Sequence, residues 1–485
     1  MLESVVNQIF SKALLFPNKK ALIEENKAIS YSELASKILA TKFALENDLN
    51  IKKGDRVIIS ANKQIGFVYA YFGAHLAGVI VVPVDFDTNQ TRLQYIILKI
   101  KPALMIGFEN PISNIMNIPI DYFDNLKGSS EINKEFPQID EIADIVFTTG
   151  TTGDPKGVIL KHRNIAASAN NINIFIQNTS EDVELLALPV SHSFGLGRIR
   201  CVLSKGATLI LLGSFTNVKK IFRIIETHGV TGFAMVPSSW AYIKKMSGTK
   251  IGKFSHLIKY IEIGSAPMPM EDKHLLIKLF PLTRICMHYG LTEASRSSFI
   301  EFNSQKDKLE TVGKSTPNVL ITIKDENGTD LPIGVEGEIC VKGDSVTSGY
   351  WNDTKTTTDS FWSDSFRTGD WGVFDESGYL SLKSRKKEII NVGGKKVSPI
   401  EVEVVLVTYP GIKECACIGI EDPNQLLGEV IKAFIVLDDG INLNFNDVKK
   451  YVGEHLEAYK IPVVFETIPE IPKTSSGKIQ RLILK

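Results

Sequence analysis

Apolar segments of strand type alternate with helix patterns over the first two-thirds of this chain, and this alternation restricts the fold more than any other feature. Residues 56–60 form a short apolar strand pattern, residues 67–77 a helix pattern, and residues 78–84 a continuous run rich in β-branched side chains. Fully apolar strands between helices are typical of a parallel sheet that helices cover on both faces. The sequence therefore predicts an α/β architecture.

Local signals support the same interpretation further along the chain. Ser30 and Glu33 have the spacing of a capping box, and the helix pattern that follows continues to about residue 46. The alternation of strands and helices then returns between residues 184 and 264. The expected segments there are residues 184–188, 207–212, 218–228, 232–236 and 260–264.

The pattern changes from about residue 311, where short strands are separated by turns rich in Gly, Asp and Asn, so we expect a β-rich portion. Near residue 398 the chain restarts with a Ser cap, Pro at the first helical position and Glu at the third. Strands at 412–420 and 430–437 and a helix near 447–459 then predict a small α+β unit. We therefore predict two domains, residues 1–385 and 386–485.

Composition excludes several classes of protein. The 485 residues include 55 basic and 55 acidic side chains, so no net field attracts a polyanion and nucleic-acid binding is not expected. The five cysteines have no zinc-site spacing and suit a reducing cytoplasm. No apolar run approaches the roughly 18 residues of a membrane helix, and no secretory leader is expected. The sequence thus predicts a cytoplasmic protein.

The strongest local signal for chemistry is a loop that follows the strand pattern at residues 144–147. Glycines let its backbone bend, threonines offer hydroxyl donors beside exposed backbone N–H groups, and a lysine supplies charge. It is not a Walker A loop, because Pro155 stands where that motif needs glycine. A polar surface turn is the alternative to a polyphosphate-binding loop. The candidate residues are Thr148, Thr149, Gly150, Thr151, Thr152, Gly153 and Lys156.

This loop resembles the phosphate-loop signature of the adenylate-forming superfamily, which comprises acyl-CoA synthetases, adenylation domains of peptide synthetases and beetle luciferases. Seven further segments resemble signatures of that family and occur in its order. The resemblance implies a large N-terminal domain of α/β subdomains with a β-rich portion, and a small mobile α+β C-terminal domain. The segments are 189–196, 264–267, 289–293, 337–339 with 349–351, 367–370, 385–401 and 472–478.

In this resemblance, two segments of the larger domain hold the nucleotide. Tyr289, followed by Gly290, offers a flat face for adenine, Thr292 a hydroxyl for the α-phosphate, and Glu293 a hard oxygen ligand for Mg²⁺. Taken alone, Glu293 would be a solvated loop acid. The loop that packs on adenine is implied to contain Gly264, Ser265, Ala266 and Pro267.

Further roles fall near the domain boundary and at the C-terminus. Asp370 is suited to accept hydrogen bonds from both ribose hydroxyls, with Arg385 adding a contact, although Asp370 alone would be a turn former. The ammonium of Lys478 can bridge the carboxylate and the α-phosphate as negative charge accumulates between them. The family resemblance implies a hinge at Lys387 and a thiol tunnel lined by Gly393 and Gly394.

The segment 189–196 bears on the acyl substrate. The resemblance places His192 near the acyl and thiol ends of the active site, whereas a lone loop histidine is usually a surface residue. Relatives that activate amino acids have an Asp near here, and this chain has Ser191, Ser193 and Gly195 instead, so an α-amino acid is disfavoured.

The acyl pocket itself is less well specified. By position it includes Phe233, Met235 and Trp240, which could equally be core residues. Arg296 is unusual just after the Thr-Glu pair, as are Arg198 and Arg200 beside the glycine-rich segment. A guanidinium near the pocket would suit a second carboxylate or phosphate; a structural ion pair is the alternative.

We therefore predict an ATP-dependent carboxylate–thiol ligase that forms an acyl-AMP, releases pyrophosphate and transfers the acyl group to CoA or to a phosphopantetheine carrier protein. Its cofactors would be ATP and Mg²⁺, and its substrate a small carboxylic acid. The alternatives are a stand-alone adenylation enzyme dedicated to a carrier protein, a non-catalytic nucleotide-binding regulator on the same fold, and a luciferase-like oxygenase.

Overall fold

The computed structural model describes residues 2–109, 115–127, 135–148, 155–393, 395–423, 428–473 and 479–484. These residues form two compact units. The first contains the described residues up to 148 together with 155–321 and 341–366, and the second contains those of 322–340 and 367–484. The division between residues 385 and 386 stays a prediction.

The first unit contains a six-stranded sheet in the order β6-β5-β3-β4-β7-β8, in which only β8 pairs antiparallel. The predicted apolar strands are its centre, and α3 between them is buried along its whole length. Parallel strands covered on both faces explain the continuous apolar runs. The elements are β3 (Arg56–Ala61), α3 (Ile65–Leu76), β4 (Ile80–Asp85), α4 (Gln90–Ile100), β5 (Leu104–Ile106), β6 (Asn117–Ile118), α5 (Tyr122–Asn125), β7 (Ile142–Phe147) and β8 (Gly157–Lys161).

A nine-stranded sheet in the same unit has the order β15-β14-β13-β12-β11-β9-β10-β1-β2. Its six central strands are parallel, and β2, β14 and β15 pair antiparallel at its edges. The strands are β1 (Lys20–Glu24), β2 (Lys27–Ser30), β9 (Val183–Leu186), β10 (Thr208–Leu211), β11 (Gly232–Met235), β12 (Tyr260–Ile263), β13 (Arg284–Tyr289), β14 (Ser298–Glu301) and β15 (Lys314–Ser315).

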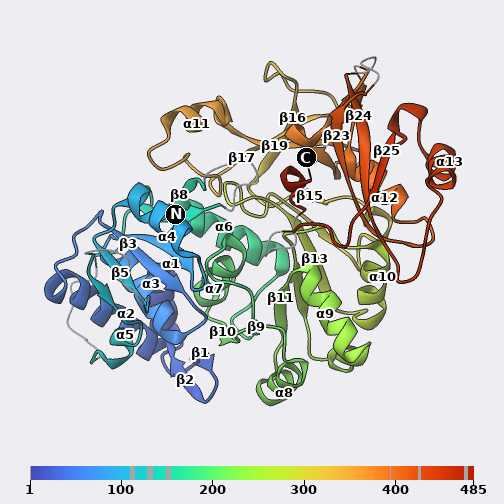
Figure 1. Ribbon diagram of the computed structural model, residues 1–485. Helices are drawn as coiled ribbons and strands as arrows, with labels where there is room; N and C mark the ends of the chain where they lie inside the picture. Colours follow the sequence, from blue (N-terminus) through green and yellow to red (C-terminus); the bar gives the residue numbers. More distant parts are fainter. Residues whose placement is uncertain are drawn as a thin grey trace. The chain divides into compact units, whose positions relative to one another are not determined.

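Helices cover both faces of this sheet (Figure 1). On one face, Ile261 and Ile263 of β12 share a core cluster with side chains of α8, α9 and α10. On the other face, Tyr260 of the same strand packs against Ala169 of α6 and Cys201 of α7. Side chains alternate along a strand, so Glu262 faces α6 and α7 with Tyr260. The helices are α6 (His162–Ile176), α7 (Ser193–Lys205), α8 (Val218–His228), α9 (Pro237–Ser247) and α10 (Met270–Leu279).

The predicted helix starts are confirmed where the structure describes them. The Ser30 side chain accepts a hydrogen bond from the Glu33 N–H, and the Glu33 carboxylate accepts one from the Ser30 N–H, which completes the capping box of α2 (Tyr31–Phe43). No helix in the described ranges is long and apolar enough to cross a membrane. The remaining elements of the first unit include α1 (Val5–Leu15), α11 (Thr354–Asp359) and β18 (Phe361–Trp362).

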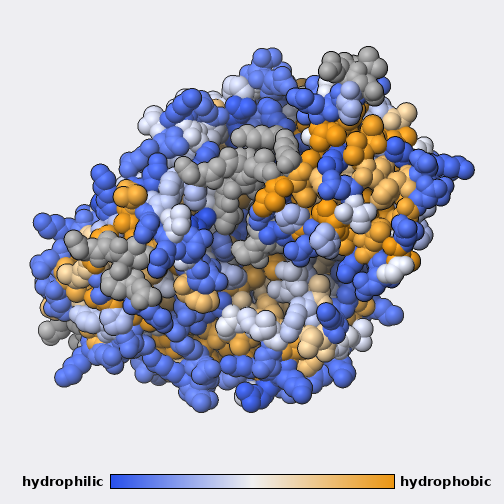
Figure 2. Space-filling model, viewed as in Figure 1, coloured by the Kyte–Doolittle hydropathy of each residue, from blue (hydrophilic) through white to orange (hydrophobic). Residues whose placement is uncertain are grey.

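The second unit contains the predicted α+β arrangement. β23 and β24 are antiparallel, β25 pairs parallel with β24, and Ser398 caps α12 as expected. Figure 2 shows apolar surface gathered where Figure 1 draws these strands and α12, and Val404 of that helix is 60% exposed. The elements are β20 (Leu380–Arg385), β21 (Ile390–Val392), β22 (Lys395–Val397), α12 (Pro399–Leu406), β23 (Ile412–Glu421), β24 (Glu429–Leu437), α13 (Phe445–His455) and β25 (Val464–Thr467). The strands β16 (Leu320–Lys324), β17 (Gly337–Lys342) and β19 (Ser365–Phe374) precede them.

A buried polar cluster surrounds Asp144 of β7. Its carboxylate accepts a hydrogen bond from the Tyr71 hydroxyl at 2.9 Å, lies 3.0 Å from Nε2 of His75 and pairs with Arg200 of α7. Burial acts to raise the pKa of Asp144, but Arg200 and His75 outweigh it and lower the pKa. The His162 ring lies 5.0 Å from that of His75, and burial lowers its pKa to about 3. His162 is therefore neutral in the folded protein.

This burial predicts a specific pH dependence of stability. The pKa of His162 is lower in the folded protein than its ordinary unfolded value of about 6.5, so the unfolded state takes up a proton first as the pH falls. When the pH is lowered from 7 to 5, we expect the unfolding free energy of the wild type to fall by about 2 kcal/mol more than that of His162→Gln. Urea titration at the two pH values measures this. His274→Gln, at an exposed position on α10, is the control; an equal loss in the His162 variant and the wild type would contradict the prediction.

Candidate active site

Two predicted nucleotide-binding segments lie at the same edge of the nine-stranded sheet. In the parallel pair β12–β13, Ile263 is in register with Met287, so Gly264, directly after β12, lies opposite His288. Tyr289 is the last residue of β13 and is largely buried. Loops beyond the carboxyl ends of parallel strands are where open α/β sheets bind ligands. The structure therefore brings residues 264–267 and 289–293 together at a position suited to a ligand.

The backbone at Gly264 lies directly on the His288 ring. A Cβ at Gly264 would lie 2.1 Å from Cε1 of His288. His288 is held in place because its Nδ1 lies 2.9 Å from Oε1 of the buried Glu262. Burial lowers the pKa of His288, so the imidazole is neutral. Ser265 follows with φ of 74°, in the left-handed region. This segment thus has a backbone that only glycine at position 264 permits.

Tyr350 joins two of the predicted site residues. Its hydroxyl donates a hydrogen bond to Oε1 of Glu293 at 2.9 Å, and Nζ of Lys156 lies 5.3 Å from the centre of its ring. The tyrosine itself is held by a backbone bridge to Val158 of β8. Burial, and then the charge of Glu293, raise the pKa of Tyr350, so the hydroxyl remains a donor. Lys156 and Glu293, far apart in the sequence, therefore meet at one aromatic ring.

The predicted phosphate loop is described only at its two ends. The N–H of Thr148 donates to the carbonyl of Lys156 at 3.0 Å, and Arg92 of α4 donates to the carbonyl of Thr148 at 3.3 Å. The antiparallel pair β7–β8 therefore brings both ends of the loop together. The predicted residues Thr149, Gly150, Thr151, Thr152 and Gly153 lie outside the described residues.

His192 is at the N-cap position of α7 and has an extended backbone. The neighbouring Ser191 donates a hydrogen bond from Oγ to Oδ2 of Asp85, the last residue of β4, at 2.7 Å. The half-buried His192 therefore lies where the end of β4 meets the start of α7.

In the second unit, Asp370 and Arg385 form the pair that the sequence analysis expected to act together. They are opposite each other on β19 and β20, and Nε of Arg385 lies 2.8 Å from Oδ1 of Asp370. Arg385 also donates to the carbonyl of Thr368 at 3.0 Å. Asp370 is 4% exposed. The arginine thus orients a carboxylate that its strand holds rigidly.

Three other predicted residues cannot be placed. Gly394 and Lys478 lie outside the described residues, and the side chain of Lys387 is not described. Gly393 directly follows β21 and has φ of 58°.

The contacts of Arg296 are with other residues of the protein. They agree with the structural ion pair, which was the alternative to a guanidinium that binds the substrate. It is 2% exposed and lies 3.0 Å from Oε1 of Glu262. Arg198 is also fully buried, between Glu184 and Glu262. Arg200 is the partner of Asp144 already described. The expectation that Arg296 binds a second carboxylate of the substrate therefore finds no support in its contacts.

The three apolar residues expected at the acyl pocket are part of a core. Phe233, Met235 and Trp240 are 2%, 0% and 0% exposed and belong to the cluster between the nine-stranded sheet and α8, α9 and α10. Their packing therefore agrees with the alternative that these three residues belong to the core.

Sequence reasoning assigned no role to Tyr350, Glu262 or His288. Tyr350 was noticed only as part of a signature. Glu262 carried a usable signal, because a charged residue inside a fully apolar strand is rare unless it is paired. The same signal marks Glu184 of β9 and Asp144 of β7.

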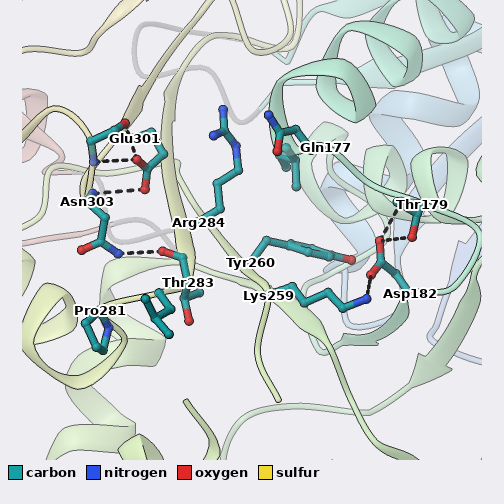
Figure 3. Close-up of a pocket in the computed structure, with 13 residues that line it drawn as sticks. Gln177, Thr179, Asp182, Lys259, Tyr260, Pro281, Thr283, Arg284, Glu301 and Asn303 are labelled. Carbon is teal, nitrogen blue, oxygen red and sulfur yellow. Dashed lines mark hydrogen bonds and ion pairs between the residues drawn. The ribbon is translucent and has the colours of Figure 1, made fainter. Parts of the chain in front are cut away.

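A cavity of about 490 Å³ lies at the other end of the parallel strands of this sheet, where β12 and β13 begin. Figure 3 shows Tyr260 and Arg284, the first residues of β12 and β13, with the Lys259–Asp182 ion pair beside them. None of the predicted site residues that the structure describes lines it. The cavity is therefore separate from the edge that collects the predicted residues.

Comparison with known proteins identifies relatives along nearly the whole chain. Residues 9–351 match the family described as AMP-binding enzyme, and residues 401–478 match the AMP-binding enzyme C-terminal domain. The chain is similar to the oxalate–CoA ligase of Saccharomyces cerevisiae, at 31% identity over 84% of this chain and 73% of the yeast protein. It is also similar to the 2-succinylbenzoate–CoA ligase of Bacillus velezensis, at 29% identity over 99% of this chain and 98% of that protein.

A solved structure agrees with these relatives. The o-succinylbenzoate–CoA synthetase of Bacillus subtilis, in complex with its acyl-adenylate intermediate, superposes with a TM-score of 0.87 at 27% identity, covering 99% of this chain and 98% of that one. The same synthetase has been solved with ATP and a magnesium ion.

Glu293, which follows β13, and Lys156, which precedes β8, meet at the ring of Tyr350, an arrangement suited to a nucleotide, and the family matches place the chain in the adenylate-forming class. The chain belongs to the AMP-binding enzyme family. It is an AMP-forming acid–thiol ligase, and the predicted fold class, family and use of ATP with Mg²⁺ are confirmed. The predicted CoA agrees with the relatives, which are CoA ligases.

The contact at Gly264 generates a prediction. Gly264→Ala places a Cβ against the buried His288 ring, and overpacking of this kind costs about 1–3 kcal/mol. We expect a lower urea midpoint and weaker ATP binding, measured by urea titration and by isothermal titration calorimetry. Gly213→Ala is the matched control, because Gly213 also follows a parallel strand of this sheet and its Cβ would meet nothing within 4 Å. Equal stability of the two variants would refute the role of His288.

Proposed function

We propose that this chain activates a small carboxylic acid with ATP, forming an acyl-AMP and pyrophosphate, and transfers the acyl group to the thiol of CoA. The observation that carries this proposal is the convergence of Lys156 and Glu293 on Tyr350. A cation and a carboxylate on one rigid support suit a magnesium polyphosphate, because Mg²⁺ is commonly bound by one or two carboxylates together with substrate phosphates.

In the first unit, the proposed roles follow from chemistry and position. Tyr289 stacks on adenine and Thr292 donates to the α-phosphate. Glu293 supplies the oxygen ligand for Mg²⁺, since Tyr350 leaves the second carboxylate oxygen available for the metal. Lys156 contributes charge for the phosphates. His192, at the start of α7, lies near the acyl and thiol groups.

In the second unit, Asp370 accepts from the ribose hydroxyls, and its pair with Arg385 supports this role by fixing the carboxylate. Lys478 bridges the attacking carboxylate and the α-phosphate, where negative charge increases in the transition state. We propose that residues 386–485 move as a domain about a hinge at Lys387. After that movement, Gly393 and Gly394 would line the passage for the thiol.

The proposed acid is small and lacks an α-ammonium group. Phe233 and Trp240 stand at positions expected for the acyl pocket and are buried in a core. Their burial supports a short acyl tail, because a long chain would have to displace them. Arg296 is already neutralised by Glu262, which favours a monocarboxylic over a dicarboxylic acid. We also propose a cytoplasmic location, which the five free and buried cysteines support.

An exchange panel tests the proposal. ATP–pyrophosphate exchange is measured with short, medium, long, aryl and dicarboxylic acids, and the thiol step is then measured with CoA and with a carrier protein. We expect exchange with short monocarboxylic acids and faster transfer to CoA. Absence of exchange with every acid would favour the nucleotide-binding regulator, and faster transfer to the carrier would favour the dedicated adenylation enzyme.

Lys478 provides a test of the first half-reaction. Lys478→Ala removes the charge that bridges two anions, so we expect exchange to fall by at least about 10²-fold, the scale seen when one electrostatic donor is lost. Thioester formation from supplied acyl-adenylate should be retained. The control is Lys473→Ala, at an exposed ion pair with Glu414 on the same C-terminal segment. Retained exchange in the Lys478 variant would refute this assignment.

Tyr350 provides a test of the metal ligand. Tyr350→Phe removes only the hydroxyl that donates to Glu293, and loss of such a supporting hydrogen bond typically costs about 10–100-fold in metal affinity. We expect the Mg²⁺ concentration for half-maximal exchange to rise by at least about tenfold. The stabilisation of the protein by ATP in thermal melts should show the same shift in Mg²⁺ dependence.

The control is Tyr242→Phe, which removes a hydroxyl bonded to the carbonyl of Thr216 near the surface of the same unit. An unchanged Mg²⁺ dependence in Tyr350→Phe would show that the hydroxyl does not support a metal ligand.

A further inference from the structure

Arg296 connects the loop after β13 to the first turn of α7. Its Nη1 donates to the carbonyl of Ser193 at 2.9 Å, and its Nη2 donates to the carbonyl of Phe194 at 3.0 Å. The guanidinium also lies 4.8 Å from the centre of the Phe194 ring. The backbone of Arg296 is in the left-handed region, with φ of 52°. The side chain of Arg296 therefore connects the segment that contains Glu293 to the two residues that directly follow His192.

A contact with β12 also fixes the guanidinium of Arg296. Nε donates to Oε1 of Glu262 at 3.0 Å, and Glu262 also pairs with Arg198 at 3.0 Å. Burial acts to raise the pKa of Glu262, but Arg296, Arg198 and the bond from His288 outweigh it and lower the pKa. Glu262 is thus ionised, and the network contains a full negative charge at its centre.

The surrounding backbone leaves little freedom for this arrangement. A Cβ at Gly197 of α7 would lie 2.7 Å from Nη1 of Arg296. A Cβ at Gly290, in the Tyr-Gly segment, would lie 2.5 Å from the backbone N of Arg296. Two glycines on two separate segments therefore make room for the same residue.

Stability alone does not account for this network. Replacing a buried ion pair by well-packed apolar side chains is often neutral or stabilising, because removing the charges from water is costly. A guanidinium instead fixes geometry, since its planar donors hold three acceptors on other segments in fixed directions, besides the hydroxyl of the adjacent Ser295. The acceptors here are on β12 and on the turn that begins α7.

We propose that Arg296 is a positioning residue, which holds the Thr292–Glu293 segment and the His192 end of α7 in one fixed relation during adenylation. This inference rests on the proposed function, because it uses the roles of Glu293 and His192. It differs from a substrate-binding role, since Glu262 and the carbonyls of Ser193 and Phe194 take up the donors of the guanidinium.

The first variant keeps the charge and removes the geometry. Arg296→Lys leaves a cation for Glu262, but an ammonium cannot hold all three acceptors. We expect kcat of ATP–pyrophosphate exchange to fall by about tenfold or more, toward the 10²-fold that a misplacement of 1 Å can cause. Because the lost interaction acts on the transition state, kcat and kcat/KM should fall by the same factor for acid and for ATP.

A second variant reaches the same contact from the other side. Gly197→Ala displaces the guanidinium from the carbonyls of α7, while alanine itself is favourable within a helix. We expect the same parallel fall of kcat and kcat/KM. This variant keeps the proposal testable if Arg296→Lys does not fold.

The matched control is Arg284→Lys, at the opposite end of β13. Arg284 also donates to a backbone carbonyl, that of Phe175 at 2.8 Å, and also lies over that residue's ring, at 5.0 Å. Figure 3 shows it at the cavity on the other edge of the sheet. We expect exchange kinetics to be unchanged in this variant.

The pH profile adds a readout that a purely structural role would not change. Arg296→Met leaves Glu262 with one fewer cation, so its pKa rises and kcat falls as the pH is lowered. In Arg296→Met with Glu262→Gln, the Glu262 carboxylate is no longer there to titrate, so this acid limb disappears. The titratable and charged groups that face Glu262 are Arg198 and Cys201 of α7, His288 and Cys286 of β13, Glu184 of β9 and Arg296 itself.

The outcomes separate this inference from the proposed function. Loss of thermal stability with wild-type kcat per folded enzyme in Arg296→Lys and Gly197→Ala would overturn the positioning role. An equal loss of kcat in Arg284→Lys would also overturn it. Failure of the proposed function instead appears as absence of acid-dependent exchange in the wild type.

Discussion

The charge of Glu262 is the constraint on which the organisation of the first unit depends. A carboxylate in the middle of a fully buried strand is stable only if cations and donors surround it. Arg198, Arg296 and His288 meet this need from α7, from the loop after β13 and from β13 itself. Since each partner comes from a different segment, satisfying one charge fixes three segments relative to each other, and two of them bear residues proposed to act in adenylation.

Much of the fold could be predicted from local patterns. The helix at residues 218–228 and the capping box at Ser30 were predicted as found, because one amphipathic face and one pair of cap residues decide them locally. The buried parallel strands were predicted from their uninterrupted apolar character. The nucleotide segments were found through their resemblance to a family, and the structure places two of them at one sheet edge.

The side-chain partners could not be predicted in the same way. Arg296 is unusual in the sequence, yet two of its acceptors are about a hundred residues earlier in the chain and Glu262 is 34 residues earlier. Tyr350 and Glu293 are separated by 57 positions, and only the fold shows that they meet. Periodicity describes a single element, whereas these contacts depend on which elements become neighbours. A charged residue inside an apolar strand, such as Glu262, was the one local sign that long-range partners must exist.

The alternation of side chains along β12 has a consequence for folding. Ile261 and Ile263 enter the apolar cluster on one face, and Glu262 enters the arginine network on the other. A shift of this strand by one residue would turn the carboxylate into the apolar layer and the isoleucines onto the guanidinium groups. Misaligned pairings with β11 or β13 would therefore leave Glu262 and Arg296 without counterions. The same acid that organises the folded unit thus also selects against incorrect strand alignment while the sheet assembles.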